Sequence, residues 1–183
     1  MPAFPRDEME EMVQRWLDAN KEAEEKNDWK ILASFYTDDA TYGWNTGAGE
    51  DFMAVGLDEI RDVAIGLEMQ GLEGWTYPYQ KTLIDDRQGE VIGLWKQVAD
   101  ARRPDGSPYE VVGIGGSWFR YAGNFKWSWQ RDFMDYNNVA VLFMEMMQAD
   151  ALSPGMKKRI EDGMSGQPQP GHYRRGTLPV SFW

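Results

Sequence analysis

The sequence offers few residue types that could carry acid–base or nucleophilic chemistry. It has 183 residues, no Cys and a single His, His172, which lies in a Gly- and Pro-rich segment where we expect no functional role. Without Cys, disulfides and thiolate chemistry are excluded. A metal site needs several converging ligands, and no spacing of Asp or Glu indicates one. We therefore expect neither a metal nor a cofactor.

Asp132 is the strongest catalytic candidate, because it falls in an alternating segment, Phe125–Asp135, that predicts a strand. If the side chain faces an apolar interior, desolvation raises its pKa, and it could act as an acid or base near neutral pH. The alternative is a structural ion pair with Lys96 or Arg131. Tyr42 could donate a hydrogen bond to a substrate oxygen or to water, or it could simply pack in the core.

Three further residues complete the candidate catalytic set. Lys96 could neutralise a developing oxyanion, or it could form a salt bridge to Asp132 or Asp100. Asp100 lies on the same predicted strand as Lys96. Asn45 ends another predicted strand, where a turn residue is the simpler interpretation.

Composition narrows the kind of partner. The chain has 9 Trp, 8 Tyr and 8 Phe, which indicates large flat surfaces to cover, either a ligand's or a second subunit's. A formal net charge of −11 disfavours nucleic acid, because phosphates are repelled. The N-terminus has no apolar run of the signal-peptide kind, and no stretch is apolar enough to span a bilayer. We expect a cytoplasmic protein with no nucleic-acid or membrane partner.

Periodicity gives the elements that must position these residues. Helical spacing predicts five helices, over residues 7–25, 29–35, 57–69, 137–149 and 153–163. Alternation predicts five strands, over residues 40–45, 75–85, 90–102, 109–121 and 125–135. Residues 46–56 are Gly-rich and predict a loop. Helices precede the strand meander rather than alternate with it, which favours an α+β class.

The order of elements predicts an architecture of three parts. Residues 1–135 are expected to form a cone, in which a curved mixed or antiparallel sheet carries the N-terminal helices over its open face. Residues 136–164 are expected to form a C-terminal helical extension packed on the cone. Residues 165–183 are expected to be a Gly/Pro-rich tail.

This order resembles the nuclear transport factor two-like (NTF2-like, SnoaL-like) superfamily, over roughly Met9 to Asp135. The resemblance is carried by Asp38-Asp39-Ala40-Thr41 after a short helix and by the segment Gly56–Arg61 that opens the third helix. It implies the cone fold shared by ketosteroid isomerase, limonene epoxide hydrolase, scytalone dehydratase and the polyketide cyclases. Because that fold hosts many chemistries, the resemblance is specific for fold rather than for function.

The catalytic residues of ketosteroid isomerase are absent. By resemblance, Trp16 falls where that family has its oxyanion-hole Tyr, Trp44 where it has its Asp base, and Ser117 near its protonated Asp. The chain is therefore not an isomerase of that type.

Limonene epoxide hydrolase gives a better local match. The segment Trp129–Asp135 is similar to that family's last-strand motif, which implies that Asp132 positions an attacking water, and Tyr42 matches its water-holding Tyr. The companion Asn falls on Trp44, with Asn45 one residue along.

The other half of that motif is incomplete. Lys96 falls near the family's Arg, but Val98 stands where the acid Asp is expected, and Asp100 lies one pleat further along. The acid that epoxide opening requires in that family is therefore absent from its expected position.

Strand alternation assigns side chains to two faces of the sheet. The inward residues are expected to be Lys96, Val98, Asp100, Gly113, Gly115, Ser117, Phe119, Gln130, Asp132 and Met134. The outward residues are expected to include Trp95, Gln97, Trp118, Trp127, Trp129 and Arg131. Mid-strand glycines indicate close approach of a ligand or of a large side chain such as Trp16 or Trp44. Outward Trp residues predict cover, either by a second subunit or by the C-terminal helix and tail.

These observations favour a cofactor-independent enzyme of lyase, hydratase or hydrolase type, acting on a hydrophobic cyclic or aromatic small molecule. Catalysis would be general acid–base, in the cone cavity, as part of a homodimer. The expected substrate-binding residues are Trp16, Trp44, Val98, Ser117, Phe119, Gln130 and Met134. The alternatives are a non-catalytic small-molecule binding protein and a dimerising module whose cavity Trp16 and Trp44 fill.

Overall fold

The computed structural model describes residues 3–47 and 49–183. The first helix, α1 (Arg6–Lys26), buries the residues that recur every three to four positions: Met9, Met12, Val13, Trp16, Ala19, Asn20 and Ala23. Asp7 and Glu8 lie in its first turn, where negative charge complements the helix dipole. Asn27 ends the helix in the left-handed conformation, with φ 50°. A short 3-10 helix, η1 (Trp29–Phe35), follows.

A seven-stranded sheet forms the centre of the fold, in the order β3-β4-β7-β8-β1-β2-β9. Its strands are β1 (Tyr36–Asn45), β2 (Glu50–Val55), β3 (Tyr79–Asp85), β4 (Glu90–Trp95), β7 (Gly115–Gly123), β8 (Lys126–Phe133) and β9 (His172–Arg174). β1 and β8 pair in parallel, whereas the other neighbours are antiparallel. The predicted α+β class with a curved, mixed sheet is confirmed.

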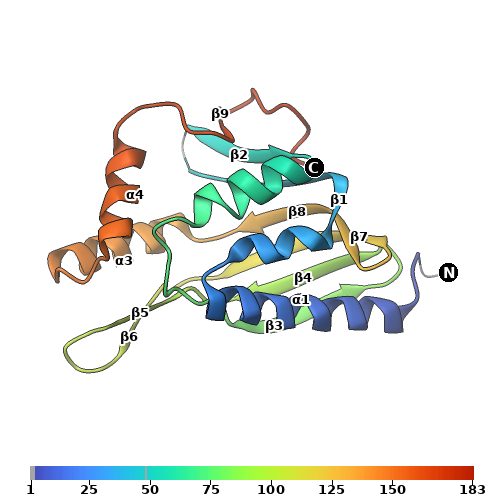
Figure 1. Cartoon of the computed structure of the whole chain (residues 1–183), viewed down its shortest axis with the longest axis horizontal. Coiled ribbons are helices and arrows are strands. Elements are labelled where there is room, and N and C mark those ends of the chain that lie inside the picture. Colours follow the sequence, from blue (N-terminus) through green and yellow to red (C-terminus); the bar gives the residue numbers. More distant parts are fainter. Residues whose placement is uncertain (1–2, 48) are drawn as a thin grey trace.

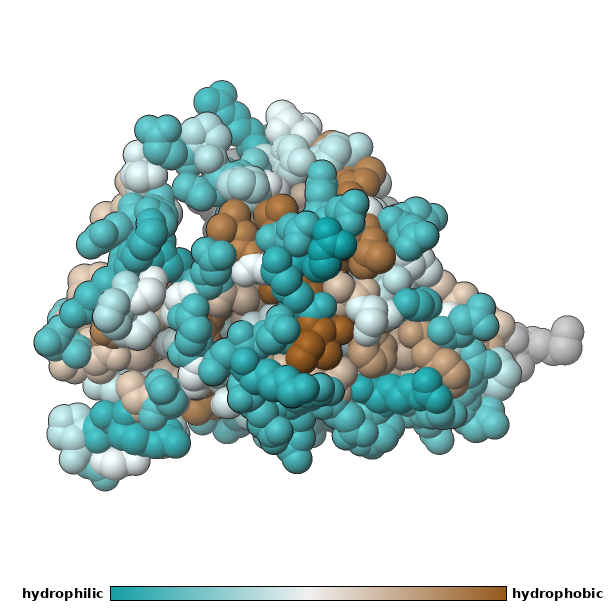
Figure 2. Space-filling model, in the orientation of Figure 1, coloured by the Kyte–Doolittle hydropathy of each residue, from teal (hydrophilic) through white to brown (hydrophobic). Residues whose placement is uncertain are grey.

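The N-terminal helices lie across one face of the sheet (Figure 1). They are α1, η1 and an irregular helix made of α2 (Leu57–Glu59), the π-helical η2 (Ile60–Ala64) and η3 (Leu67–Met69). The main core lies between these helices and the sheet, where Trp16 packs edge-on against both Phe119 and Trp127. The solvent side of α1 is largely hydrophilic, as its amphipathic pattern requires (Figure 2).

The C-terminal helices pack around a second, smaller core. α3 (Tyr136–Gln148) and α4 (Pro154–Met164) contribute Leu142, Met146 and Met156 to it. Tyr109 joins them from a separate two-stranded sheet, β5 (Val98–Arg102) and β6 (Pro108–Glu110). The division of the chain at residues 135 and 164 remains a prediction.

Three predicted elements differ in the structure. The expected strand 109–121 is divided into β6 and β7, which belong to different sheets. The expected loop 46–56 contains β2, because its Phe52, Met53 and Ala54 are buried and pair with β1; only the turn before them is Gly-rich. The expected strand 90–102 breaks after Trp95, and the chain resumes as β5, which pairs with β6 and has left the main sheet. Alternation cannot be carried across such a break, since it resets which residues face inward.

Of the four Trp residues predicted to face outward from the sheet, two do so. Trp118 and Trp129 pack against each other on the outer face, and Trp183 packs edge-on against Trp118. Arg131 also faces outward, and its guanidinium donates to the backbone oxygens of Phe182, at 2.7 Å, and Ser181, at 3.2 Å. The end of the tail therefore covers this face, one of the two kinds of cover expected.

The other two Trp residues face inward, so their predicted orientation was wrong. Trp127 is fully buried in the main core, because the register between β7 and β8 shifts at Tyr121 and two residues of β8 match one of β7. Such a bulge turns the side chains beyond it to the opposite face. Trp95 faces inward because it pairs with Gly115, on the Ser117 side of β7.

Candidate functional site

A cavity of about 280 Å³ lies between the helices and the inner face of the sheet. Ten of its lining residues are aromatic: Trp16, Trp29, Tyr36, Tyr42, Trp44, Tyr77, Tyr79, Trp95, Tyr136 and Phe143. A cavity of roughly 150 Å³ holds benzene, so this one has room for about two fused rings. Trp16 and Trp44 form parts of the wall and leave the cone open.

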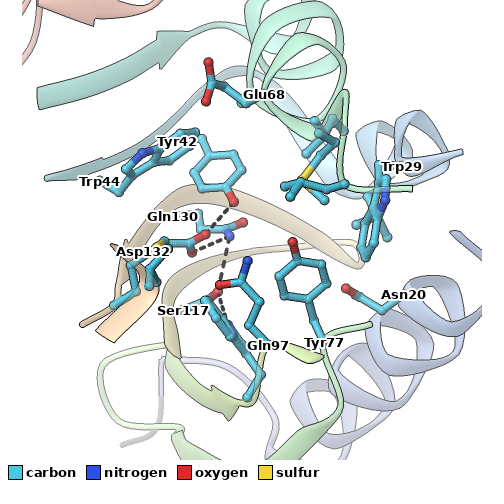
Figure 3. Close-up of a pocket in the computed structure, with 18 of the residues that line it drawn as sticks. Asn20, Trp29, Tyr42, Trp44, Glu68, Tyr77, Gln97, Ser117, Gln130 and Asp132 are labelled. Atoms are coloured by element: carbon cyan, nitrogen blue, oxygen red, sulfur yellow. Dashed lines mark hydrogen bonds between the residues drawn. The ribbon is translucent and has the colours of Figure 1, made fainter. Parts of the chain in front are cut away.

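Asp132 lies at the floor of this cavity, where its carboxylate accepts hydrogen bonds at both oxygens (Figure 3). The Tyr42 hydroxyl donates to Oδ2 at 2.6 Å. The Gln130 side-chain nitrogen donates to Oδ1 at 2.8 Å. Tyr36 in turn donates to Gln130 Oε1, which turns the NH₂ group of the amide toward Asp132. Neither ion pair considered as a structural role for Asp132, with Lys96 or with Arg131, is present.

Strand register brings these residues together from distant parts of the sequence. In the parallel pair β1–β8, Tyr42 lies beside Gln130 and Trp44 beside Asp132. In the antiparallel pair β7–β8, Ser117 lies beside Asp132. Because all these positions share one face of the sheet, their side chains converge on the same point of the cavity floor.

Burial dominates the electrostatics of the floor. Desolvation raises the pKa of Asp132, although hydrogen bonds from Gln130, Tyr42 and Ser117 oppose the rise. Burial and the nearby Asp132 charge raise the pKa of Tyr42 well above its usual value, so Tyr42 stays a hydrogen-bond donor. The pair can therefore exchange a proton at the carboxyl while the phenol holds its position.

Hydrogen bonds also fix the aromatic walls. Trp95 Nε1 donates to Ser117 Oγ at 3.0 Å, and Trp16 Nε1 donates to the Tyr79 hydroxyl at 2.9 Å. Gly115 makes room for Trp95, since a Cβ at that position would lie 2.5 Å from the indole ring. The mid-strand glycine predicted to allow close approach thus accommodates Trp95, rather than Trp16 or Trp44. The second expected glycine, Gly113, precedes β7 and faces Asp135.

A second polar cluster, of Glu68, Arg159 and His172, lies in the cavity wall. Its Glu68 lies across Tyr42 from Asp132 (Figure 3). Arg159 donates to Glu68 Oε2 at 2.9 Å, and His172 Nε2 lies 3.2 Å from Glu68 Oε1. Burial alone would raise the pKa of Glu68, but the His172 hydrogen bond and the Arg159 charge outweigh it and lower the pKa. Glu68 is therefore a carboxylate whose charge is already compensated.

Sequence reasoning missed this cluster. His172 was expected to have no role in the tail, yet pairing of β9 with β2 places it in the cavity wall. Its contact with Glu68 joins positions 104 residues apart, and neither position stands in a recognisable pattern. The only local signal was the aromatic neighbour Tyr173, which is too weak to predict a strand.

Five predicted site residues lie outside the cavity. Lys96 pairs with Glu110 at 2.6 Å and its side chain is 45% exposed, because β4 ends before it. Val98 and Asp100 belong to β5, outside the main sheet, and Asp100 is exposed beside Gly74. Asn45 is exposed and donates to Asp51 at 2.7 Å. Phe119 is buried behind the wall, stacked on Trp127.

The other predicted site residues line the cavity: Trp16, Tyr42, Trp44, Ser117, Gln130, Asp132 and Met134. Their roles in binding and catalysis stay predictions. Over residues 3–47 and 49–183, no cluster of three or more His, Asp or Glu side chains could hold a metal ion. In the same part of the chain no helix combines the length and apolar character needed to cross a bilayer.

Comparisons with known proteins add the fold but no activity. No family model matches the sequence, and no curated protein matches it either. Solved structures do match. A protein from Shewanella putrefaciens named as a SnoaL-like polyketide cyclase aligns with a TM-score of 0.56 and 15% identity, over 78% of this chain and 88% of that one.

Two further structures give the same result. One, from Shewanella denitrificans and also named as a SnoaL-like polyketide cyclase, aligns with a TM-score of 0.53 and 15% identity, over 72% of this chain and 96% of that one. An NTF2-like protein of unknown function from Burkholderia pseudomallei aligns with a TM-score of 0.51 and 12% identity, over 72% and 96%. The chain therefore has the cone-shaped α+β fold of the NTF2-like, SnoaL-like superfamily.

Proposed function

We propose that the protein binds a ring-containing hydrophobic small molecule in the cone cavity and acts on it by general acid–base catalysis at Asp132. The observation that carries this proposal is the Asp132 carboxyl on the floor of an aromatic cavity, held by Tyr42 and Gln130. Desolvation brings its pKa toward the range in which proton transfer is efficient. A positioned carboxyl group can serve a lyase or hydratase reaction by general acid–base catalysis without a cofactor. The similarity to structures named as SnoaL-like polyketide cyclases supports the proposal that the substrate is a small molecule that contains or forms a ring.

Proton abstraction next to a ketone tests this directly. The probe is 2-tetralone, a bicyclic ketone that fits the cavity, and the readout is exchange of its C1 protons for deuterium by NMR. Wild-type protein is expected to accelerate exchange over Asp132→Asn by about 10²–10⁴-fold, the usual contribution of a positioned base. Glu110→Gln is the matched control, because Glu110 is a carboxylate outside the cavity, paired with Lys96. Equal exchange in wild type and Asp132→Asn would refute the assignment.

A non-catalytic binding protein is the second candidate. It is favoured by the position of Lys96, since the expected oxyanion-stabilising cation lies outside the cavity and pairs with Glu110. Saturable binding of 2-tetralone without any exchange would support this candidate over the enzyme. Failure to bind 2-tetralone or any other bicyclic probe would contradict both.

We also propose that the protein is a cytoplasmic homodimer. The support for the dimer is a group of exposed apolar side chains on one face of α3 and next to it: Ile114, Phe133, Val141, Met144 and Met147. A surface of this kind favours a protein partner. Light scattering after size exclusion tests the dimer; a monomer that persists at high concentration would contradict it.

A further inference from the structure

The lining of the cavity holds two carboxylates, and only one of them has a cation beside it. Glu68 is bonded to Arg159 and lies within hydrogen-bond distance of His172. Asp132 is different: over residues 3–47 and 49–183, no Lys, Arg or His side chain forms an ion pair with it. Arg131, next to it in sequence, points to the opposite face of the sheet and binds the tail.

Burial opposes ionisation of Asp132, but the hydrogen bonds that it receives favour the ionised form. An ionised carboxylate only accepts hydrogen bonds, and both oxygens of Asp132 are met by donors, from Tyr42 and Gln130. Ser117 also lowers the pKa by hydrogen bonding. Buried charges in proteins are ordinarily paired with an opposite charge. Asp132 has the hydrogen bonds that a buried carboxylate requires but no paired cation in the part of the chain that the structure describes.

Several of the side chains around Asp132 are aromatic, and aromatic rings attract cations. Tyr42 lies edge-on to Trp44, 5.3 Å between ring centroids, and stacks at 6.2 Å on Tyr36. Trp95 approaches from the other side through Ser117. The faces of such rings carry partial negative charge and attract cations, especially where water is excluded. Among the described residues that line the cavity, Arg159 is the only Lys or Arg, and it is paired with Glu68.

We propose that the ligand of this cavity carries a positive charge on its ring system, which forms an ion pair with Asp132 against the aromatic wall. The inference rests on the proposed function and deepens it by naming the substrate class: a cationic nitrogen compound of about two rings. The ligand's cation stabilises the ionised carboxylate, so Asp132 would act as a base toward it rather than as an acid.

Probes of matched shape separate charge from hydrophobicity. N-methylquinolinium and 1-methylnaphthalene have the same ring frame and methyl group and differ in charge; 1-naphthoate presents the opposite charge. Binding to the full-length protein is measured by calorimetry, with thermal shift as a second readout. N-methylquinolinium is expected to bind at least ten-fold more tightly than 1-methylnaphthalene, and 1-naphthoate more weakly than either.

Variants locate the preference. In Asp132→Asn the ten-fold preference for the cation is expected to disappear, while 1-methylnaphthalene still binds and so reports an intact cavity. Glu110→Gln removes one negative charge from the protein outside the cavity, and the preference is expected to persist. Unchanged preference in Asp132→Asn overturns the inference.

The remaining outcomes are distinguishable. Equal or tighter binding of 1-methylnaphthalene or 1-naphthoate to wild-type protein overturns the cationic ligand but leaves the proposed function standing, and this comparison needs no variant. Failure of all three probes to bind overturns the proposed function together with the inference.

Discussion

Gly115→Ala should lower stability and narrow the cavity, although the backbone of Gly115 does not require glycine. A Cβ there would lie 2.5, 2.7 and 3.0 Å from three atoms of the Trp95 ring. The ring cannot turn away easily, because Trp95 Nε1 is bonded to Ser117 Oγ and the ring packs edge-on against Tyr77. The substitution therefore pushes Trp95 toward the cavity.

The magnitude follows from two opposing effects. Overpacking costs about 1–3 kcal/mol, and three contacts at or below 3.0 Å favour the upper half of that range. Reduced backbone entropy of the unfolded chain returns about 0.4–1 kcal/mol. The net loss is about 1–2.6 kcal/mol. For a chain of this size, that loss lowers Tm by roughly 2–10 °C.

Urea unfolding and thermal scans measure the loss, and titration with 2-tetralone measures the change in the cavity. Gly163→Ala is the control, since Gly163 lies in α4 with no atom within 4 Å of its would-be Cβ; it should instead stabilise by about 0.5–1 kcal/mol. Adding Trp95→Phe should recover part of the loss in Gly115→Ala. If Gly115→Ala is as stable as wild type and binds the probe equally, the packing argument is wrong.

Three other changes test the carboxylates and the tail. Burial raises the pKa of Asp132 above the value of about 3.9 in the unfolded chain, so the native state loses stability as pH rises through the window above that value. In urea unfolding, the stability of Asp132→Asn relative to wild type should therefore increase from pH 4 to pH 7. The pKa of Glu68 is lowered, so Glu68→Gln should cost about 1–3 kcal/mol at pH 7 and progressively less as acid protonates the wild-type carboxylate; a constant difference would contradict this. Deleting residues 180–183 removes the Phe182 and Ser181 acceptors of Arg131 and should cost about 1–3 kcal/mol, with more dye bound at the uncovered outer face. An unchanged unfolding midpoint would show that the tail contributes nothing there.

Local patterns predicted the floor of the site and Trp16 in its wall, but not the cluster of Glu68, Arg159 and His172. Alternation along β8 placed Gln130, Asp132 and Met134 on one face, and helical spacing placed Trp16 on the buried side of α1; the structure agrees. Trp16 lies within the long helix α1, and the three β8-side residues all follow the bulge at Trp127, so the side-chain period is not interrupted between them. The pairing of β9 with β2, which brings in His172, depends on contacts far apart in sequence and leaves no periodic trace in three residues.

Errors arose where regular alternation stopped. The break after Trp95 moved Lys96 outside and brought Trp95 inside, reversing both assignments. The bulge near Tyr121 turned Trp127 from the expected outer face to the inner face of the sheet. A single irregular residue reverses every assignment beyond it, and nothing in the sequence marked either position, because aromatic residues occupy both faces of these strands.

The contrast between the two carboxylates explains why Asp132 is the better functional candidate. Glu68 has Arg159 and His172 beside it, so its environment already favours the charged form and leaves it little to gain from a ligand. Asp132 is held by neutral donors alone, and its burial is a cost to stability at neutral pH. Structural carboxylates are usually satisfied within the protein, whereas perturbed, incompletely compensated ones cluster at functional sites. A cationic ligand paired with Asp132 would remove this cost of burying an unpaired carboxylate. The stability that the protein recovers in this way would add to the free energy of ligand binding.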